Sequence, residues 1–109
     1  KVWKEDGQYY VVLGGQSKED HLGQALLYSS VDLISWIYEG VIAKSEGIAE
    51  QGYIWECPDI FTLNEQQILL MSPKGIEPAG DAYQNLHQTG CKFCILDIFA
   101  CKRVCGIGI

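Results

Sequence analysis

An internal repeat constrains the fold of this chain more than any other feature of its sequence. Residues 1–13 align without a gap with residues 59–71, and apolar residues coincide at the second and third positions and along the last four. The first unit predicts four strands separated by polar turns, within residues 2–3, 8–15, 24–29 and 36–43. A repeat of four short strands is the unit of a β-propeller blade, so we predict an all-β, antiparallel fold of this kind.

The second unit supplies only its first two strands, which end near residue 75, so the chain predicts about one and a half blades of four-stranded sheet. Each blade of a propeller buries its faces against neighbouring blades. We therefore expect exposed apolar surface and low stability for the chain alone.

Composition limits the classes of function. The 109 residues suffice for one small domain, and 48% hydrophobic with 20% charged residues is typical of a globular protein. A net charge of −6 argues against nucleic acid as a partner, and no apolar run is long enough for a membrane helix. The sole arginine is Arg103, so an anion site within residues 1–90 would need lysine or backbone amides. These exclusions leave a small molecule as the expected partner.

The cysteines divide the chain into two parts. Four of the five lie between residues 91 and 105, whereas residues 1–90 contain only Cys57, which we expect to be a small buried side chain. This distribution does not fit a secreted disulfide scaffold and favours a reducing, cytoplasmic location. We predict a partial propeller domain over residues 1–90 and a Cys-rich tail over residues 91–109.

The tail raises the alternative of a metal site. The spacing of Cys91 and Cys94 is that of a zinc-ligand pair, but the spacings to Cys101 and Cys105 fit poorly. Redox chemistry at the first pair lacks the expected βαβ context. We therefore predict no metal and no cofactor, and leave zinc binding by the tail as an alternative.

A single carboxylate carries the strongest candidate chemistry. Glu56 lies in Trp55-Glu56-Cys57-Pro58-Asp59, just before the first strand of the second unit. Burial against Trp55 would favour the protonated form of a general acid, and Pro58 is expected to hold Cys57 extended. In a propeller, the residues before equivalent first strands meet at one end of the central channel, where we expect a ligand pocket. The alternative is a solvated carboxylate at a strand edge.

Two other polar residues have simpler explanations. Asp32 follows Ser30 in a short turn, where either side chain can bind the local backbone. His21 lies in a charged loop and is expected to be solvated.

The segment around Glu56 resembles the "ECP" motif of the β-fructofuranosidases, the invertase and sucrose-6-phosphate hydrolase family (glycoside hydrolase family 32). The resemblance extends over residues 1–90. It includes Lys1-Val2-Trp3, which is similar to the segment after the family's Arg-Asp-Pro motif, and further segments at residues 28–36, 72–75, 83–85 and 88–90.

This resemblance implies a five-bladed β-propeller followed by a β-sandwich, and retaining hydrolysis of terminal β-fructosides such as sucrose or sucrose 6-phosphate. It implies that Glu56 is the catalytic acid/base and that Trp55 shapes the substrate pocket. The family's nucleophile motif, Asn-Asp-Pro-Asn, and its Arg-Asp-Pro stabiliser motif do not occur in this sequence. We therefore expect a fragment that is inactive alone. The alternative is a non-catalytic carbohydrate-binding or interaction fragment.

Overall fold

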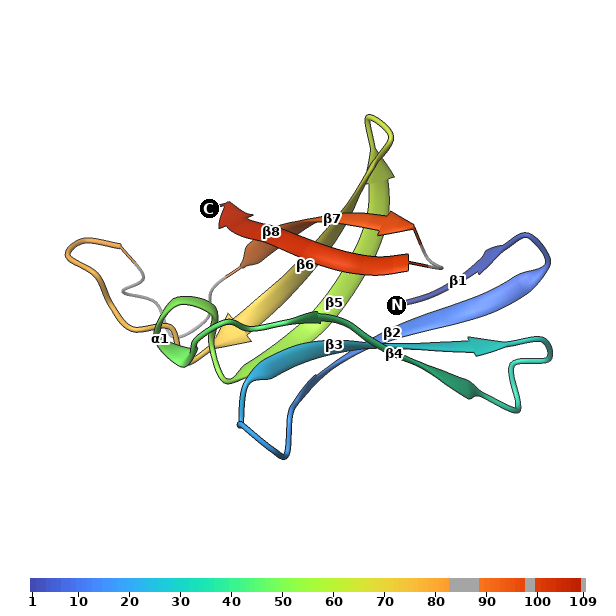
Figure 1. Cartoon of the computed structure of the whole chain (residues 1–109), viewed down its shortest axis with the longest axis horizontal. Helices are drawn as coiled ribbons and strands as arrows, with labels where there is room; N and C mark the ends of the chain where they lie inside the picture. Colours follow the sequence, from blue (N-terminus) through green and yellow to red (C-terminus); the bar gives the residue numbers. More distant parts are fainter. Residues whose placement is uncertain (83–88, 98–99, 109) are drawn as a thin grey trace.

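Two four-stranded antiparallel sheets make up nearly all of the chain. The computed structural model describes residues 1–82, 89–97 and 100–108, and for residues 91–108 the backbone alone. The first sheet has the order β1 (Val2–Glu5), β2 (Gln8–Gln16), β3 (Gly23–Ser30) and β4 (Ile37–Lys44). The second has the order β5 (Ile54–Leu63), β6 (Gln66–Lys74), β7 (Gly90–Asp97) and β8 (Ala100–Gly108). The predicted all-β, antiparallel architecture is confirmed (Figure 1).

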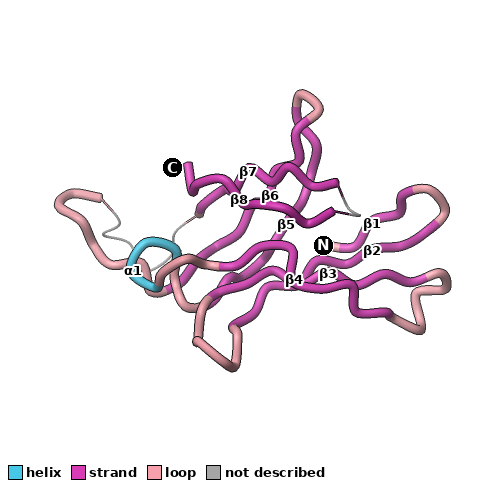
Figure 2. The backbone as a smooth tube through the Cα atoms, in the orientation of Figure 1, coloured by secondary structure: helices cyan, strands magenta, loops and turns pink. Residues whose placement is uncertain are grey.

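One short helix, α1 (Ile48–Gln51), lies in the connection between the two sheets (Figure 2). In the part of the chain that the structure describes, no helix has the length and apolar character needed to cross a membrane.

The internal repeat is confirmed by strand bounds and register. The bounds of β2 and β6 differ by the same offset that aligns residues 1–13 with 59–71. Val2 pairs with Val11 in the first unit, and the equivalent Ile60 pairs with Leu69 in the second. Both hairpin turns have two successive residues with positive φ: 49° and 81° at residues 6–7, and 49° and 63° at residues 64–65. Two such residues match the right-handed twist of the flanking strands, so the two units begin with the same hairpin.

The second sheet contains more strands than the sequence predicted. Two strands were expected there, and β7 and β8 add two more from the Cys-rich segment. Residues 91–105 contain four Cys, two Phe and two Ile, which suit a sheet, and β7 covers the edge that β6 would otherwise expose. The predicted domain boundary after residue 90 stays a prediction. The resembling residues 83–85 and residue 88 lie outside the described part of the chain.

The core lies between the two sheets. Buried side chains of the first sheet, among them Val12 and Leu27, pack with Trp55, Leu69 and Met71 of the second. Successive strand residues point to opposite faces, so alternate residues of β6 reach this core. Apolar side chains remain exposed at the β3–β4 turn, where Val31 is 77% and Ile34 84% accessible, in agreement with the exposed apolar surface that the sequence predicted.

Candidate active site

A β-bulge interrupts β5 immediately after Glu56. Glu56 pairs with Ser72 and Asp59 pairs with Leu70, so the two residues between them, Cys57 and Pro58, lie opposite Met71 alone. Cys57 has a φ of 48°, in the left-handed region that non-glycine residues seldom adopt. The predicted extended geometry of Cys57 is therefore wrong. The extra residue of the bulge requires this turn in the backbone, and the requirement outweighs the preference that a following proline imposes.

The bulge places two carboxylates on one face of the second sheet. Residues three apart in a regular strand point to opposite faces. Here their partners on β6, Ser72 and Leu70, are two apart, so Glu56 and Asp59 share a face. Trp55, which pairs with Pro73, points to the other face. The bulge therefore changes the direction of side chains in the segment where the sequence predicted the catalytic group.

Glu56 is partly exposed and paired with a lysine. Its Oε1 lies 2.9 Å from Nζ of Lys74, and the two side chains are 41% and 33% accessible. The hydrogen bond and charge of Glu56 raise the pKa of the Lys74 ammonium group above its usual value. The expected burial of Glu56 against Trp55 is wrong, because neighbouring strand residues face opposite ways.

Trp55 is a core residue. Its side chain is 1% accessible, and its indole Nε1 donates a hydrogen bond of 2.7 Å to the carbonyl oxygen of Gln51 in α1. The indole lies directly over Gly23 of β3, where an added Cβ would come within 2.6 Å of the ring. The predicted role of Trp55 toward substrate stays a prediction, while its position shows that it joins the two sheets.

The start of the first unit lies beside this site. Nζ of Lys1 is 2.7 Å from Oδ1 of Asp59, and the α-amino group of Lys1 donates to the carbonyl oxygen of Pro58 at 3.5 Å. The first residue of one repeat thus contacts the bulge that opens the next. The predicted meeting of the residues before equivalent first strands stays a prediction, because the counterparts of residues 56–58 are not among these 109 residues.

Comparison with known proteins supplies the family. A model of the family described as "Glycosyl hydrolases family 32 N-terminal domain" matches residues 1–100. This chain belongs to glycoside hydrolase family 32. The chain forms part of that family's β-propeller, and the resemblance seen in the sequence is confirmed.

Relatives within family 32 are similar over most of this chain. The sucrose-6-phosphate hydrolase of Bacillus subtilis (strain 168) is 44% identical over 92 residues, which are 83% of this chain and 19% of the relative. The raffinose invertase of Escherichia coli is 42% identical over 90 residues, 83% of this chain and 18% of the relative. The chain therefore spans about a fifth of the length of these curated relatives.

Solved structures of family 32 show the same arrangement of strands. The Bombyx mori GH32 beta-fructofuranosidase aligns with a TM-score of 0.80 and 45% identity, over 88% of this chain and 20% of that one. Sucrose-6-phosphate hydrolase from Lactobacillus gasseri aligns with a TM-score of 0.69 and 34% identity, over 86% of this chain and 19% of that one.

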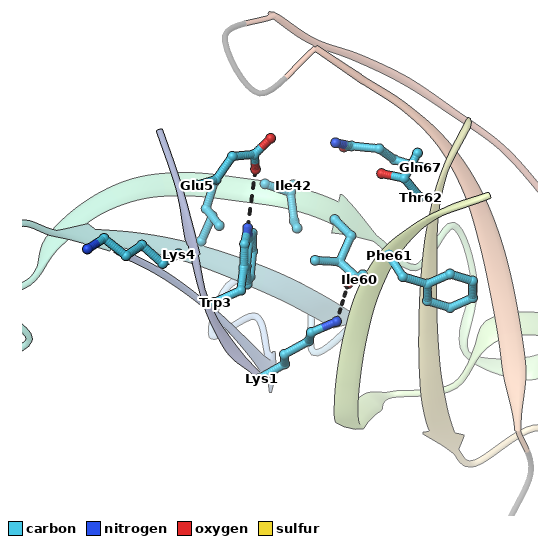
Figure 3. Close-up of a pocket in the computed structure, with 10 residues that line it drawn as sticks. Lys1, Trp3, Lys4, Glu5, Ile42, Ile60, Phe61, Thr62 and Gln67 are labelled. Carbon is cyan, nitrogen blue, oxygen red and sulfur yellow. Dashed lines mark hydrogen bonds between the residues drawn. The ribbon is translucent and has the colours of Figure 1, made fainter. Parts of the chain in front are cut away.

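The family-32 sheets also enclose a crevice that the sequence did not predict. Its volume is about 280 Å³, and Trp3, Ile42 and Ile60 point into it from the two sheets (Figure 3). Trp3 stacks on Tyr10 with ring centroids 5.6 Å apart. Oε1 of Gln67, which also lines the crevice, is buried and has no hydrogen-bond partner among the described residues. Glu56 does not line this crevice, so the two features are separate.

The structure also tests the predictions for Asp32, His21 and Cys57. Oδ1 of Asp32 accepts hydrogen bonds from the backbone N–H groups of Ile34 and Ser35 at 2.9 and 2.8 Å, which confirms its local role. His21 is exposed, as expected. Cys57 is exposed rather than buried, because the bulge turns it out of the sheet, so that prediction is wrong.

The metal alternative is not resolved by the described residues. Among them, no group of three or more Asp, Glu, His and Cys side chains is placed to hold a metal ion. The side chains of the four tail cysteines lie outside the described part of the chain, so zinc binding by the tail stays open.

Sequence reasoning missed Lys74 as a partner of Glu56. Lys74 is part of the Ser72-to-Gly75 segment that resembles the family, but the pairing depends on the register of β5 with β6. Counting back along β5 and β6 from the hairpin turn at residues 64–65 would have placed Glu56 and Lys74 near each other. The bulge determines which residues of the two strands face each other, and the sequence alone does not show it.

Proposed function

We propose that this chain is part of a hydrolase that cleaves terminal β-fructosides, with Glu56 as its acid/base residue. The observation that carries the proposal is the placement of Glu56, partly exposed, at the β5 bulge, where the carbonyl oxygen of Pro58 accepts a hydrogen bond from Lys1 of the first unit. The names of the relatives support the substrate class, because they include sucrose-6-phosphate hydrolases and a raffinose invertase. A variant of the Bombyx mori neighbour was solved in complex with sucrose.

The proposed chemistry uses Glu56 twice. Its protonated carboxyl group donates a proton to the oxygen that leaves with the non-fructosyl part of the substrate. Its carboxylate then removes a proton from the water that releases fructose from the enzyme. Retaining hydrolysis needs a second carboxylate about 5 Å from the first as nucleophile. The nucleophile motif implied by the resemblance does not occur in these 109 residues, so we propose that the chain alone releases no fructose.

A chimera tests the role of Glu56. Residues 1–90 would replace the matching segment of the Bacillus subtilis sucrose-6-phosphate hydrolase, which is 44% identical over 92 residues. We expect the chimera to release fructose and its Glu56→Gln variant to lose about 10²–10⁴-fold in rate. Glu39→Gln, on β4 of the first sheet, is the control and should retain the rate. Full activity of the Glu56→Gln chimera, or fructose release by the 109-residue chain that Glu56→Gln abolishes, would contradict the proposal.

A second candidate function is carbohydrate binding without catalysis. The crevice between the sheets favours it, because the indole of Trp3 suits a sugar ring, and the amide oxygen of Gln67, which has no partner among the described side chains, suits a hydroxyl donor. Calorimetric titration of the 109-residue chain with fructose and sucrose tests it. Heat of binding that Trp3→Ala or Gln67→Leu removes and that Glu56→Gln leaves unchanged would favour this function over catalysis.

We also propose a cytoplasmic location. The exposed thiol of Cys57 and the clustered cysteines of the tail suit a reducing compartment. Cell fractionation that finds the protein outside the cytoplasm would contradict this.

A further inference from the structure

We propose that two copies of this chain associate head to tail, with the outer face of the first sheet in one copy packed against the outer face of the second sheet in the other. The outer face of each sheet is the face that points away from the core between the two sheets. The inference does not rest on the chemistry proposed for Glu56. It names an interaction surface and the partner that fits it, a second copy of the chain.

The internal repeat shows that the two sheets present opposite faces to their shared core. In β2, Tyr10 and Val12 belong to the core, so Val11 between them points to the outer face. In β6, Leu69 belongs to the core. The gap-free alignment of the two units makes Leu69 the equivalent of Val11, not of Tyr10 or Val12. The sheets are therefore stacked front to back, as successive units of one series.

The first strands of the two units show the same exchange of faces. Trp3 packs against the core from the first sheet, whereas its equivalent Phe61 is 39% accessible. Ile60 packs against the core from the second sheet, whereas its equivalent Val2 is 53% accessible. The outer face of each sheet thus corresponds to the core-forming face of the other. A contact that is made once within the chain can be made again between two copies.

The outer face of the first sheet is apolar across all four strands. Residues that pair across neighbouring strands share a face, so the strand register identifies its members. They are Val2, Val11, Leu13, Leu26, Tyr28, Tyr38 and Val41. The rings of Tyr28 and Tyr38 lie 5.2 Å apart. Four of the seven side chains are between 38% and 55% accessible, so this face is a contiguous, exposed apolar surface of the kind that marks an interaction site.

The outer face of the second sheet supplies the complementary surface. Its apolar members on β5 and β6 are Phe61, Leu63, Ile68 and Leu70. Three of their equivalents in the first sheet are aromatic or aliphatic residues that pack against the second sheet. Ile68 is buried and yet lies outside the core between the sheets, which agrees with its place on the opposite face. The two outer faces are therefore the two halves of the contact already present in the chain.

The charges beside this contact are also complementary. Within the chain, Nζ of Lys1 lies 2.7 Å from Oδ1 of Asp59, which is the repeat equivalent of Lys1. A head-to-tail contact brings the same two positions together as Asp59 of one copy and Lys1 of the other, again with opposite charges. The net charge of −6 makes two copies repel each other at long range. Salt of about 0.15 M screens this repulsion beyond about 8 Å.

Sedimentation of the 109-residue chain in about 0.15 M salt tests the association. Head-to-tail contacts close into rings or extend into open chains, so we expect masses of two copies or more. Leu13→Lys and Phe61→Lys each bring an unpaired charge into the contact, and each should raise the dissociation constant at least about tenfold. Ile34→Lys is the matched control, because Ile34 is 84% accessible in the β3–β4 turn and lies outside both faces. It should associate as wild type does.

Mixing the two variants tests the head-to-tail arrangement. Leu13→Lys keeps an intact outer face on the second sheet, and Phe61→Lys keeps one on the first sheet. Each variant alone should be monomeric at concentrations at which an equimolar mixture forms a 1:1 dimer. A contact between two identical faces would not give this result. Circular dichroism checks that each variant is folded, and Tyr38→Lys and Leu63→Lys, at residues 55% and 54% accessible, replace a variant that is not.

Four results would each overturn the inference. The first is a wild-type chain that stays monomeric up to about 1 mM, which would leave the outer faces to a different partner, such as further sheets of a family-32 protein. The second is unchanged self-association in a folded variant of either face. The third is the absence of a dimer in the mixture. The fourth is an equal loss of association in Ile34→Lys, which would show a general effect of added charge.

Discussion

Lys1 and Asp59, which occupy equivalent positions in the two repeat units, form an ion pair with 2.7 Å between Nζ and Oδ1. The same ammonium group donates a hydrogen bond of 2.7 Å to the carbonyl oxygen of Ile60, so one side chain links the two repeat units. Glu56 lies just before this link on β5. The repeat therefore determines where the candidate acid lies relative to the neighbouring unit.

We predict that Asp59→Asn lowers the free energy of unfolding by less than about 1 kcal/mol, because both partners are partly exposed and solvent screens the pair. The difference from wild type should shrink in about 1 M salt, where screening is stronger. Urea denaturation at low and high salt measures it. Asp20→Asn, which removes the partner of Lys44, is the control and should behave similarly. A salt-independent loss of several kcal/mol would show that the pair is not screened.

Gly14 and Gly15 of β2 should respond oppositely to alanine. A Cβ at Gly14 would clash with the backbone carbonyl of Trp55 and come within 3.2 Å of Pro58, whereas nothing lies within 4 Å of a Cβ at Gly15. We expect Gly14→Ala to destabilise the chain by about 1–3 kcal/mol, because the two sheets must separate. Gly15→Ala should be neutral or slightly stabilising. Denaturation curves of the two variants measure their free energies of unfolding. Equal values would argue against this contact between the sheets.

Trp55 should prove to be a structural residue. Its indole is buried between the sheets and bonded to Gln51, so Trp55→Ala should cost about 3–5 kcal/mol and leave little folded protein. Trp55→Phe keeps most of the packing and loses the hydrogen bond, and should fold with reduced stability. If sugar binding by the folded Trp55→Phe variant equals that of wild type, the indole is not a substrate contact. A selective loss of sugar affinity in a stable variant would support the substrate role instead.

The sequence predicted the repeat, the strands of the first unit and the shared hairpin, because all three depend on local patterns. Apolar alternation and the turn at Asp6-Gly7 define a register without tertiary information. The candidate acid was also found locally, from the residues that surround Glu56.

Other features could not be predicted because they depend on pairing between strands. The bulge is visible only when β5 is set against β6, and it alone turns Cys57 outward and places Glu56 and Asp59 on one face. The burial of Trp55 depends on Gly14 and Gly23 in the other sheet. The strands β7 and β8 were missed because residues 91–105 carry none of the turn signals that marked the earlier strands.

Asp32 should make the stability of the chain depend on pH. Backbone hydrogen bonds from Ser35 and Ile34 lower the pKa of Asp32 below its ordinary value of 3.8. The stabilisation is therefore complete above 3.8 and is lost as the pH falls through the lower pKa of the folded state. Asp32→Asn should lose less stability than wild type between neutral and acid pH. Val31→Asn, at an exposed neighbour, should keep the wild-type dependence, and the same dependence in both variants would contradict the assignment.

Cys57 allows a direct test of the bulge. Its φ of 48° suits glycine, which has no Cβ, and opposes a β-branched side chain. We expect Cys57→Gly to preserve or raise the free energy of unfolding and Cys57→Val to lower it by about 1–3 kcal/mol. Cys57→Ala separates the loss of the thiol from backbone strain, and its free energy of unfolding should lie between those of the glycine and valine variants. Because the side chain is exposed, lost packing does not explain a deficit in the valine variant. If valine were tolerated as well as glycine, β5 would run without the bulge, and Glu56 and Asp59 would point to opposite faces.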